Sequence, residues 1–137
     1  MLFRSARACG VMQAAFEAGL SYAVDRKVFG KPVADYQLSL VKFARMAMYL
    51  GASRQFTYAV GRMMDDGGGQ MEASLVKLLA CKLSEWTIRA AMQILGRMGY
   101  VEASPASWYW LVPSVQLTFA RTHETQSPKL LRSNQIE

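Results

Sequence analysis

The sequence predicts an all-α fold, an antiparallel up-and-down bundle of three long helices with a shorter C-terminal helix. Apolar and small residues recur at helical spacing through three long segments of the chain. Breaks rich in glycine and proline separate these segments, and patterns that alternate apolar and polar residues are absent. Because short turns join neighbouring helices, the helices are expected to run antiparallel.

The first helix is predicted from Phe3 to Tyr22, and Gly30 with Pro32 breaks the chain after it. The second is predicted over residues 35–64 and ends before the flexible turn "DDGGG". Its expected apolar face contains Leu38, Val41, Phe43, Met46, Leu50, Phe56, Tyr58, Val60 and Met63.

The third helix is predicted from Met71 to Met98, closed by the glycines at 96 and 99. A further helix is predicted to start at Pro105, because proline suits the first turn, and to kink or end at Pro113. After Thr122 the chain becomes polar. Residues 1–126 are therefore predicted to form the bundle, and residues 127–137 a loosely held tail.

The chain of 137 residues is 52% hydrophobic and 19% charged, which is typical of one globular domain. No apolar run approaches the roughly 18 residues of a membrane span, and the first ten residues lack a signal peptide's apolar stretch. A cytoplasmic location is therefore expected. The net charge is +6, but the cations are spread out and no nucleic-acid motif is present, so no nucleic-acid partner is expected.

Cys9 and Cys81 are isolated cysteines without a CxxC motif or a nearby histidine, which excludes the common zinc spacings. Both lie among alanines and leucines, so buried thiols are expected and no metal site is predicted. The one histidine, His123, belongs to no recognisable catalytic motif.

Two long segments, "ACGVMQAAFEAGLSYAVDRKVFGKPVADYQ" and "EASLVKLLACKLSEWTIRAAMQILGRMGY", resemble the C-terminal helical domain of the acyl-CoA dehydrogenases. The motifs that carry the resemblance are an Arg-x-x-Phe-Gly-x-Pro turn, which begins at Arg26, and a Gln-Ile-x-Gly turn, which begins at Gln93. The resemblance covers residues 5–126, more loosely after residue 104. The N-terminal helical domain and the β-domain of that family have no counterpart in this sequence.

The resemblance implies a flavoprotein oxidoreductase of fatty acid metabolism. In that family FAD lies between a β-domain and this helical domain, and a neighbouring subunit holds part of the cofactor. The resemblance therefore implies a homo-oligomer, a dimer or tetramer, or a full-length acyl-CoA dehydrogenase subunit as partner. The residues that it places at FAD are Arg26, Phe29, Gln37, Gln93, Gly96, Gly99, Thr122 and Glu124.

Two positions depart from the family pattern. Ala120 stands where many members carry the glutamate that abstracts the α-proton of the acyl thioester, and alanine cannot accept a proton. No catalytic residue is therefore predicted, and the chain is expected to be inactive alone. Arg97 replaces the second glycine of the family's Gln-Ile-x-Gly-Gly turn, where it either hinders a close backbone approach or binds a phosphate.

Several of the assigned residues also have a purely structural interpretation, and Gly96 with Gly99 would be sufficient as a helix stop. Arg26 would be a cation at a helix end, Phe29 a plug for the end of the bundle, and Gln37 an ordinary surface residue. The leading hypothesis is a truncated C-terminal domain of that family, which contributes FAD binding and oligomerisation to the α,β-dehydrogenation of an acyl-CoA thioester. One alternative is a self-associating helical interaction module, motivated by the aromatic run "SWYWLV". The other is a non-catalytic subunit that completes FAD binding in a separate chain.

Overall fold

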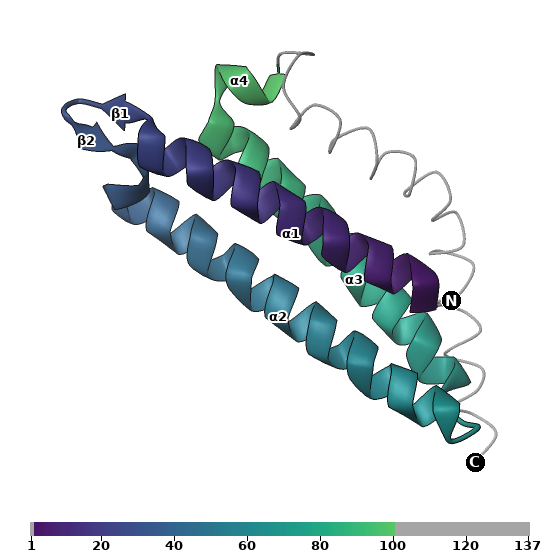
Figure 1. The fold of residues 1–137 in the computed structure, drawn as a ribbon. Coiled ribbons are helices and arrows are strands. Elements are labelled where there is room, and N and C mark those ends of the chain that lie inside the picture. Colours follow the sequence, from purple (N-terminus) through teal and green to yellow (C-terminus); the bar gives the residue numbers. More distant parts are fainter. Residues whose placement is uncertain (1, 101–137) are drawn as a thin grey trace.

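A computed structural model describes residues 2–100 of the chain and confirms the all-α prediction. Its helices are α1 (Leu2–Asp25), α2 (Gln37–Asp65), α3 (Gln70–Leu95) and the short α4 (Arg97–Tyr100). Figure 1 shows α1, α2 and α3 side by side in an up-down-up arrangement, with α4 folded over the end of α3. The third predicted helix is thus two helices, because Gly96 ends the first of them.

The main core lies where the three long helices meet near the hairpin between α1 and α2. Small side chains let the helices approach closely: a Cβ added at Gly19 would lie 3.6 Å from the Cβ of Ala91. The rings of Phe16 and Phe43 meet edge to face, with centroids 5.9 Å apart. The buried members of this cluster are Ala15, Ala23, Phe43, Met46, Ile88, Ala90, Ala91 and Ile94.

The predicted apolar face of α2 is partly wrong. Its buried face runs through Phe43, Met46, Leu50 and Val60, as expected, and continues through the buried hydroxyl residues Ser53 and Thr57. Residues with polar side chains complete this stripe because helical spacing, and not hydropathy, decides which positions face inward. The expected members that the structure leaves exposed are Leu38, Val41, Tyr58 and Met63.

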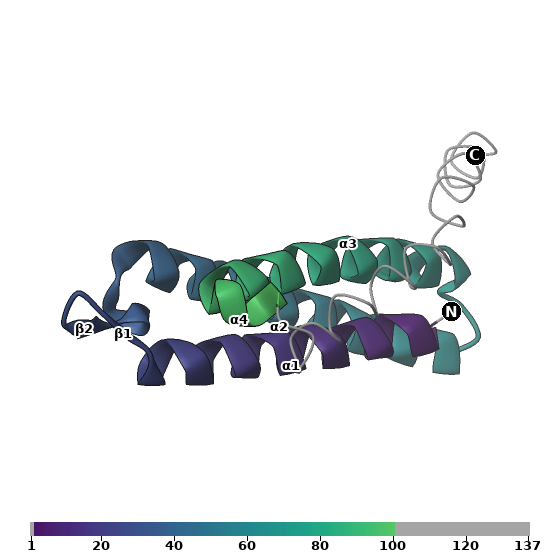
Figure 2. The same cartoon turned by 90° about the horizontal axis from the view of Figure 1, so that it is seen from above.

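A small β-hairpin connects α1 to α2 at one end of the bundle. Strand β1 (Lys27–Val28) pairs antiparallel with β2 (Lys31–Pro32), and the 3-10 turn η1 (Val33–Asp35) leads into α2. The Val33 N–H donates to the Arg26 carbonyl at 2.8 Å, and the Tyr36 hydroxyl donates to the Val28 carbonyl at 2.5 Å. Figure 2 shows the hairpin extending beyond the helix ends.

Several predictions concern residues outside the described part of the chain. These are the helix from Pro105, the role of His123 and the tail at 127–137. Over residues 2–100, no helix is long and apolar enough to cross a membrane. The same residues hold no cluster of three potential metal ligands.

Candidate functional site

The up-down-up topology brings the described candidate residues to one end of the bundle. Residues 26–37 form the hairpin and the start of α2, while residues 93–99 form the end of α3 and α4. Because α3 runs back to the end where α1 finishes, these two segments lie at the same end (Figure 1). We call this region the hairpin end, defined by residues 26–37 and 93–99.

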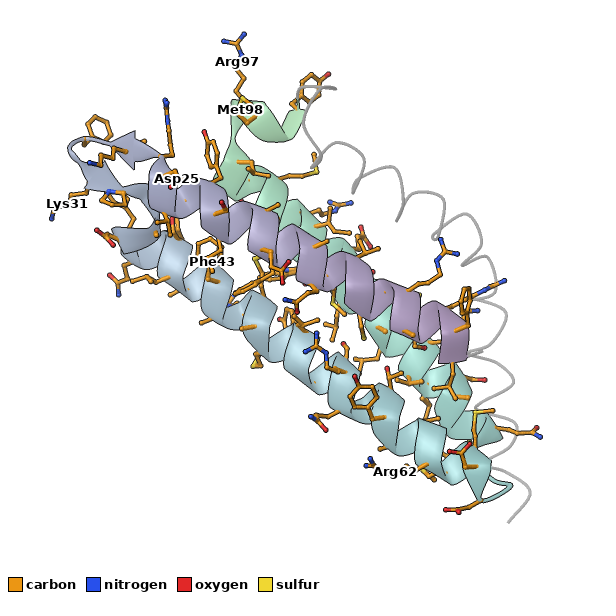
Figure 3. The ribbon with its side chains drawn as sticks, in the orientation of Figure 1. Asp25, Lys31, Phe43, Arg62, Arg97 and Met98 are labelled. Carbon is orange, nitrogen blue, oxygen red and sulfur yellow. The ribbon has the colours of Figure 1, made fainter. Side chains whose placement is uncertain are left out.

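The hairpin end carries a group of exposed cations. Lys31 and Arg97 point away from the helices in Figure 3. Within residues 2–100 none of these exposed cations forms an ion pair. Two exposed carboxylates, Asp25 and Asp35, lie in the same region. Sequence reasoning gave no role to the two lysines, although the run "DRKVFGK" contains them. The exposed cations are Arg26, Lys27, Lys31 and Arg97.

Phe29 sits at the tip of the hairpin in a costly conformation. It has φ 50° and Gly30 has φ 80°, so both turn residues adopt the left-handed conformation used by tight hairpin turns. A bulky side chain there costs on the order of 1–3 kcal/mol. The ring is 95% exposed, so the interpretation of Phe29 as a plug for the bundle is wrong. An exposed aromatic held at such a cost indicates a surface that contacts another group.

Replacing Phe29 with asparagine is expected to raise the free energy of unfolding by about 1 kcal/mol, because asparagine tolerates a positive φ better than phenylalanine. Urea unfolding measures the change. Phe3→Asn is the matched control: Phe3 is 73% exposed but lies in α1, so its substitution should bring no gain. A Phe29→Asn variant that is no more stable than the wild type would contradict the inference that Phe29 is strained.

The remaining candidates differ in how open their surroundings are. Gln37 and Gln93 are exposed. Gly96 has φ 55°, and a Cβ there would meet nothing within 4 Å, so a ligand could approach this backbone. Gly99 is buried instead, where an added Cβ would lie 2.8 Å from the carbonyl oxygen of Met92. Its glycine is thus needed to pack α4 onto α3.

Three positions that bear on the site lie outside the described residues. They are Thr122 and Glu124, which the resemblance assigns to FAD, and Ala120 at the position of the family's catalytic glutamate.

The two cysteines are buried and free, as the sequence predicts. Burial raises the pKa of the Cys9 thiol, and the Thr57 hydroxyl and the Arg54 charge oppose this only in part. Burial likewise raises the pKa of Cys81, against the opposing charges of Lys77 and Arg4. Both groups therefore remain protonated, poorly nucleophilic thiols at neutral pH.

Because the folded-state pKa of Cys9 is raised, its contribution to stability is complete below the unfolded pKa of about 8.5 and is lost as pH rises further. We expect the stability difference between the wild type and Cys9→Ala to shrink as the pH rises above the unfolded pKa of about 8.5. Urea unfolding at several pH values measures it. Ser21→Ala, at an exposed position of α1, should show a constant difference. A constant difference for Cys9→Ala would refute the raised pKa.

Comparison with known proteins identifies the family and supports the fold. Residues 2–126 match the family described as "Acyl-CoA dehydrogenase, C-terminal domain". The chain is 32% identical over 123 residues to the mitochondrial short-chain specific acyl-CoA dehydrogenase of Bos taurus, covering 89% of this chain. It is 35% identical over 99 residues, 72% of this chain, to the probable acyl-CoA dehydrogenase YngJ of Bacillus subtilis (strain 168).

The fold is also similar to butyryl-CoA dehydrogenase from Megasphaera elsdenii, with a TM-score of 0.81 and 27% identity, over 83% of this chain and 30% of that one. The chain spans 30% of the length of the Bos taurus relative and 26% of that of YngJ. The chain belongs to the acyl-CoA dehydrogenase family, and residues 2–126 correspond to the family's C-terminal domain.

Proposed function

We propose that this chain contributes FAD binding and oligomerisation to the flavin-dependent α,β-dehydrogenation of an acyl-CoA thioester, and that it is inactive alone. The observation that carries the proposal is the hairpin end, where cations that are exposed and form no ion pair within residues 2–100 lie at the same end of the bundle as the exposed ring of Phe29. FAD carries a pyrophosphate and two ring systems. The cations suit the pyrophosphate, and the Phe29 ring suits a ring system.

Arg26 is proposed to bind the pyrophosphate. A guanidinium presents a planar pair of N–H donors that matches two phosphate oxygens. Lys27, Lys31 and Arg97 would add positive potential around it, because all three are exposed at the same end. Arg97 points outward from α4 (Figure 3), which supports the phosphate-binding interpretation of its side chain.

The other assigned residues would orient the cofactor. The Phe29 ring would pack against a ring system of FAD, with Gln37 near its adenosine end and Gln93 donating from α3. The open backbone at Gly96 would allow close approach, while Gly99 would hold α4 in place. By family position, Thr122 and Glu124 would complete the site. When bound, FAD supplies the acceptor for the substrate hydride.

The proposed inactivity rests on Ala120. Removing an α-proton from an acyl thioester needs a base within hydrogen-bonding reach, and a methyl group cannot serve. A second chain, such as a full-length acyl-CoA dehydrogenase subunit, would then supply the base and the remaining cofactor contacts. The division into a bundle at 1–126 and a tail at 127–137, the cytoplasmic location and the place in fatty acid metabolism remain parts of this proposal.

A flavin titration of the chain tests the proposal, with flavin fluorescence as readout and FMN as comparison. We expect saturable FAD binding and weaker FMN binding, because FMN lacks the pyrophosphate. The same sample, given butyryl-CoA and an electron acceptor, should form no enoyl-CoA. Absence of saturable FAD binding would refute the cofactor role, and turnover by the chain alone would refute the inactivity.

The outer face of α2 supports the oligomerisation part. Leu40, Val41 and Met48 are 54%, 44% and 58% exposed, and the small exposed residues Ala44 and Gly51 share their face of α2 at helical spacing. This stripe lies opposite the buried face of α2. A contiguous exposed apolar stripe with small residues is typical of a helix that packs on another copy. The same observation favours the alternative hypothesis of a self-associating module.

Met48→Lys is expected to convert the oligomer into a monomer, because it places a charge in the centre of this stripe while leaving the core intact. Size-exclusion chromatography with light scattering measures the mass. Met71→Lys is the control, since Met71 is 39% exposed on α3, away from this face. A wild-type monomer at high concentration, or an oligomer that survives Met48→Lys, would contradict the interface.

A further inference from the structure

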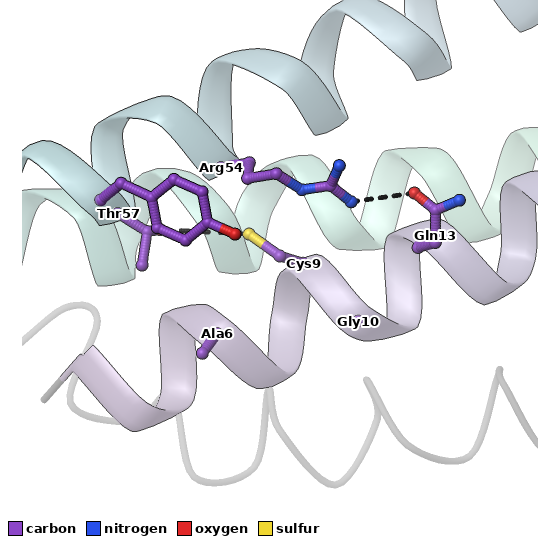
Figure 4. A pocket seen from close by; sticks show the side chains of 7 residues that line it. Ala6, Cys9, Gly10, Gln13, Arg54 and Thr57 are labelled. Carbon is purple, nitrogen blue, oxygen red and sulfur yellow. Dashed lines mark hydrogen bonds between the residues drawn. The ribbon is translucent and has the colours of Figure 1, made fainter.

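A cavity of about 310 Å³ opens between α1 and α2, away from the hairpin end. Figure 4 shows residues of both helices around it. Cys9 and Arg26 are 17 positions apart, so the cavity lies about 25 Å along the helix axis from the hairpin end. Its lining residues are Ala6, Cys9, Gly10, Gln13, Arg54, Thr57 and Tyr58.

Small side chains on α1 create this space. Ala6 and Gly10 are four residues apart, on the same side of α1. A Cβ added at Gly10 would meet nothing within 4 Å, so the volume in front of this residue is empty. The wall on this side is therefore apolar and open to a ligand.

One cation faces the cavity from α2. The half-buried Arg54 donates from Nη2 to the Gln13 Oε1 at 2.9 Å, as Figure 4 shows. Gln13 in turn donates from Nε2 to the carboxylate of the exposed Glu17. Arg54 itself forms no ion pair within residues 2–100. A neutral amide thus holds the guanidinium in position and leaves other N–H groups free for an anion.

The remaining polar groups of the wall are neutral or already bonded. The Thr57 hydroxyl donates to the Ser53 carbonyl at 2.7 Å. The Cys9 Sγ lies 4.0 Å from the Thr57 Oγ1, and burial keeps this thiol protonated by raising its pKa. Among the described residues, the lining therefore combines one cation, Arg54, with otherwise uncharged and largely apolar side chains.

We propose that this cavity binds a small organic monocarboxylate, with its carboxylate on Arg54 and its short apolar chain over Ala6 and Gly10. The planar guanidinium matches the two oxygens of a carboxylate. The volume lies at the lower end of ligand pockets, which admits a chain of a few carbons and excludes a nucleotide-sized molecule. The site is separate from the proposed flavin surface and does not depend on it.

An NMR titration of the full chain with hexanoate tests the proposal, with hexan-1-ol and hexylamine as comparisons. We expect saturable amide shifts at residues 6–13 and 54–58, with hexanoate binding at least about tenfold tighter than hexan-1-ol. Hexylamine, which carries the opposite charge, should not bind measurably. Equal affinity for hexanoate and hexan-1-ol, no saturable shifts, or shifts confined to the hairpin end would overturn the proposal.

Two variants separate the head and chain contacts. Arg54→Met should weaken hexanoate binding at least about tenfold and leave hexan-1-ol binding unchanged. Gly10→Leu should abolish binding of both, and it should keep the fold because leucine favours helix over glycine and its Cβ has room. Arg62→Met, at an exposed cation near the end of α2, is the control and should change neither. Hexanoate affinity that is unchanged in Arg54→Met, or hexanoate binding that persists in Gly10→Leu, would refute the assigned site.

Discussion

Met46→Ala is expected to lower the free energy of unfolding by about 2–5 kcal/mol. Met46 is 0% exposed on α2 and belongs to the cluster where the three long helices meet. Truncation removes apolar contacts and leaves a cavity that helices already in close contact fill poorly. Urea unfolding measures the loss, with an unchanged m-value expected if the unfolded state is unaffected.

Met63→Ala is the matched control, because Met63 lies on the same helix and is 43% exposed. Its cost should stay within about 1 kcal/mol, since little apolar area returns to water. If the two variants lose equal stability, the buried face of α2 has been assigned incorrectly, and with it the packing that places the hairpin end.

Arg26→Ala is expected to weaken FAD binding by about 10- to 100-fold, the usual effect of removing a charge-assisted hydrogen bond. Arg26 is exposed, follows the last residue of α1, and forms no ion pair within the described residues. Its substitution should therefore affect the cofactor more than the fold. The flavin titration measures the affinity, and urea unfolding shows whether stability is preserved.

Arg62→Ala controls for the loss of one positive charge, because Arg62 lies at the opposite end of α2 from the hairpin (Figure 3). It should leave FAD affinity unchanged. Arg26→Lys should recover part of the affinity, since an ammonium keeps the charge but not the planar pair of donors. Equal losses for Arg26→Ala and Arg62→Ala would mean that net charge, and not a contact with Arg26, determines binding.

Most of the helical architecture is predictable from the sequence because its breaks are strong. Gly30 with Pro32 and the "DDGGG" turn separate segments whose apolar spacing is helical. The hairpin is not predictable from alternation, because each strand has only two residues. The exposure of several apolar residues of α2 is not predictable for a different reason. Hydropathy identifies a residue as apolar but does not say whether it packs in the core or lies on the surface.

The candidate site is partly predictable for a topological reason. Two motifs far apart in sequence, at Arg26 and Gln93, must lie at the same end when a bundle runs up, down and up. The strain at Phe29 is visible only in the backbone geometry, because a phenylalanine before a glycine in the sequence does not indicate a positive φ. The cavity beside Arg54 was also missed. In the sequence, Ala6 and Gly10 are ordinary small residues of a helix. Only the structure shows that they line a cavity together with Arg54.

Hydrogen exchange of the full chain, with and without FAD, tests directly whether the hairpin end binds the flavin. The proposal predicts slower exchange at residues 26–37 and 93–100 when FAD is bound, because a ligand on the hairpin end stabilises the hairpin and α4 against local opening. The turn between α2 and α3, at residues 66–69, should be unaffected. Saturating FAD that leaves the hairpin end unchanged, or protects only other segments, would contradict the assignment of this surface to the flavin.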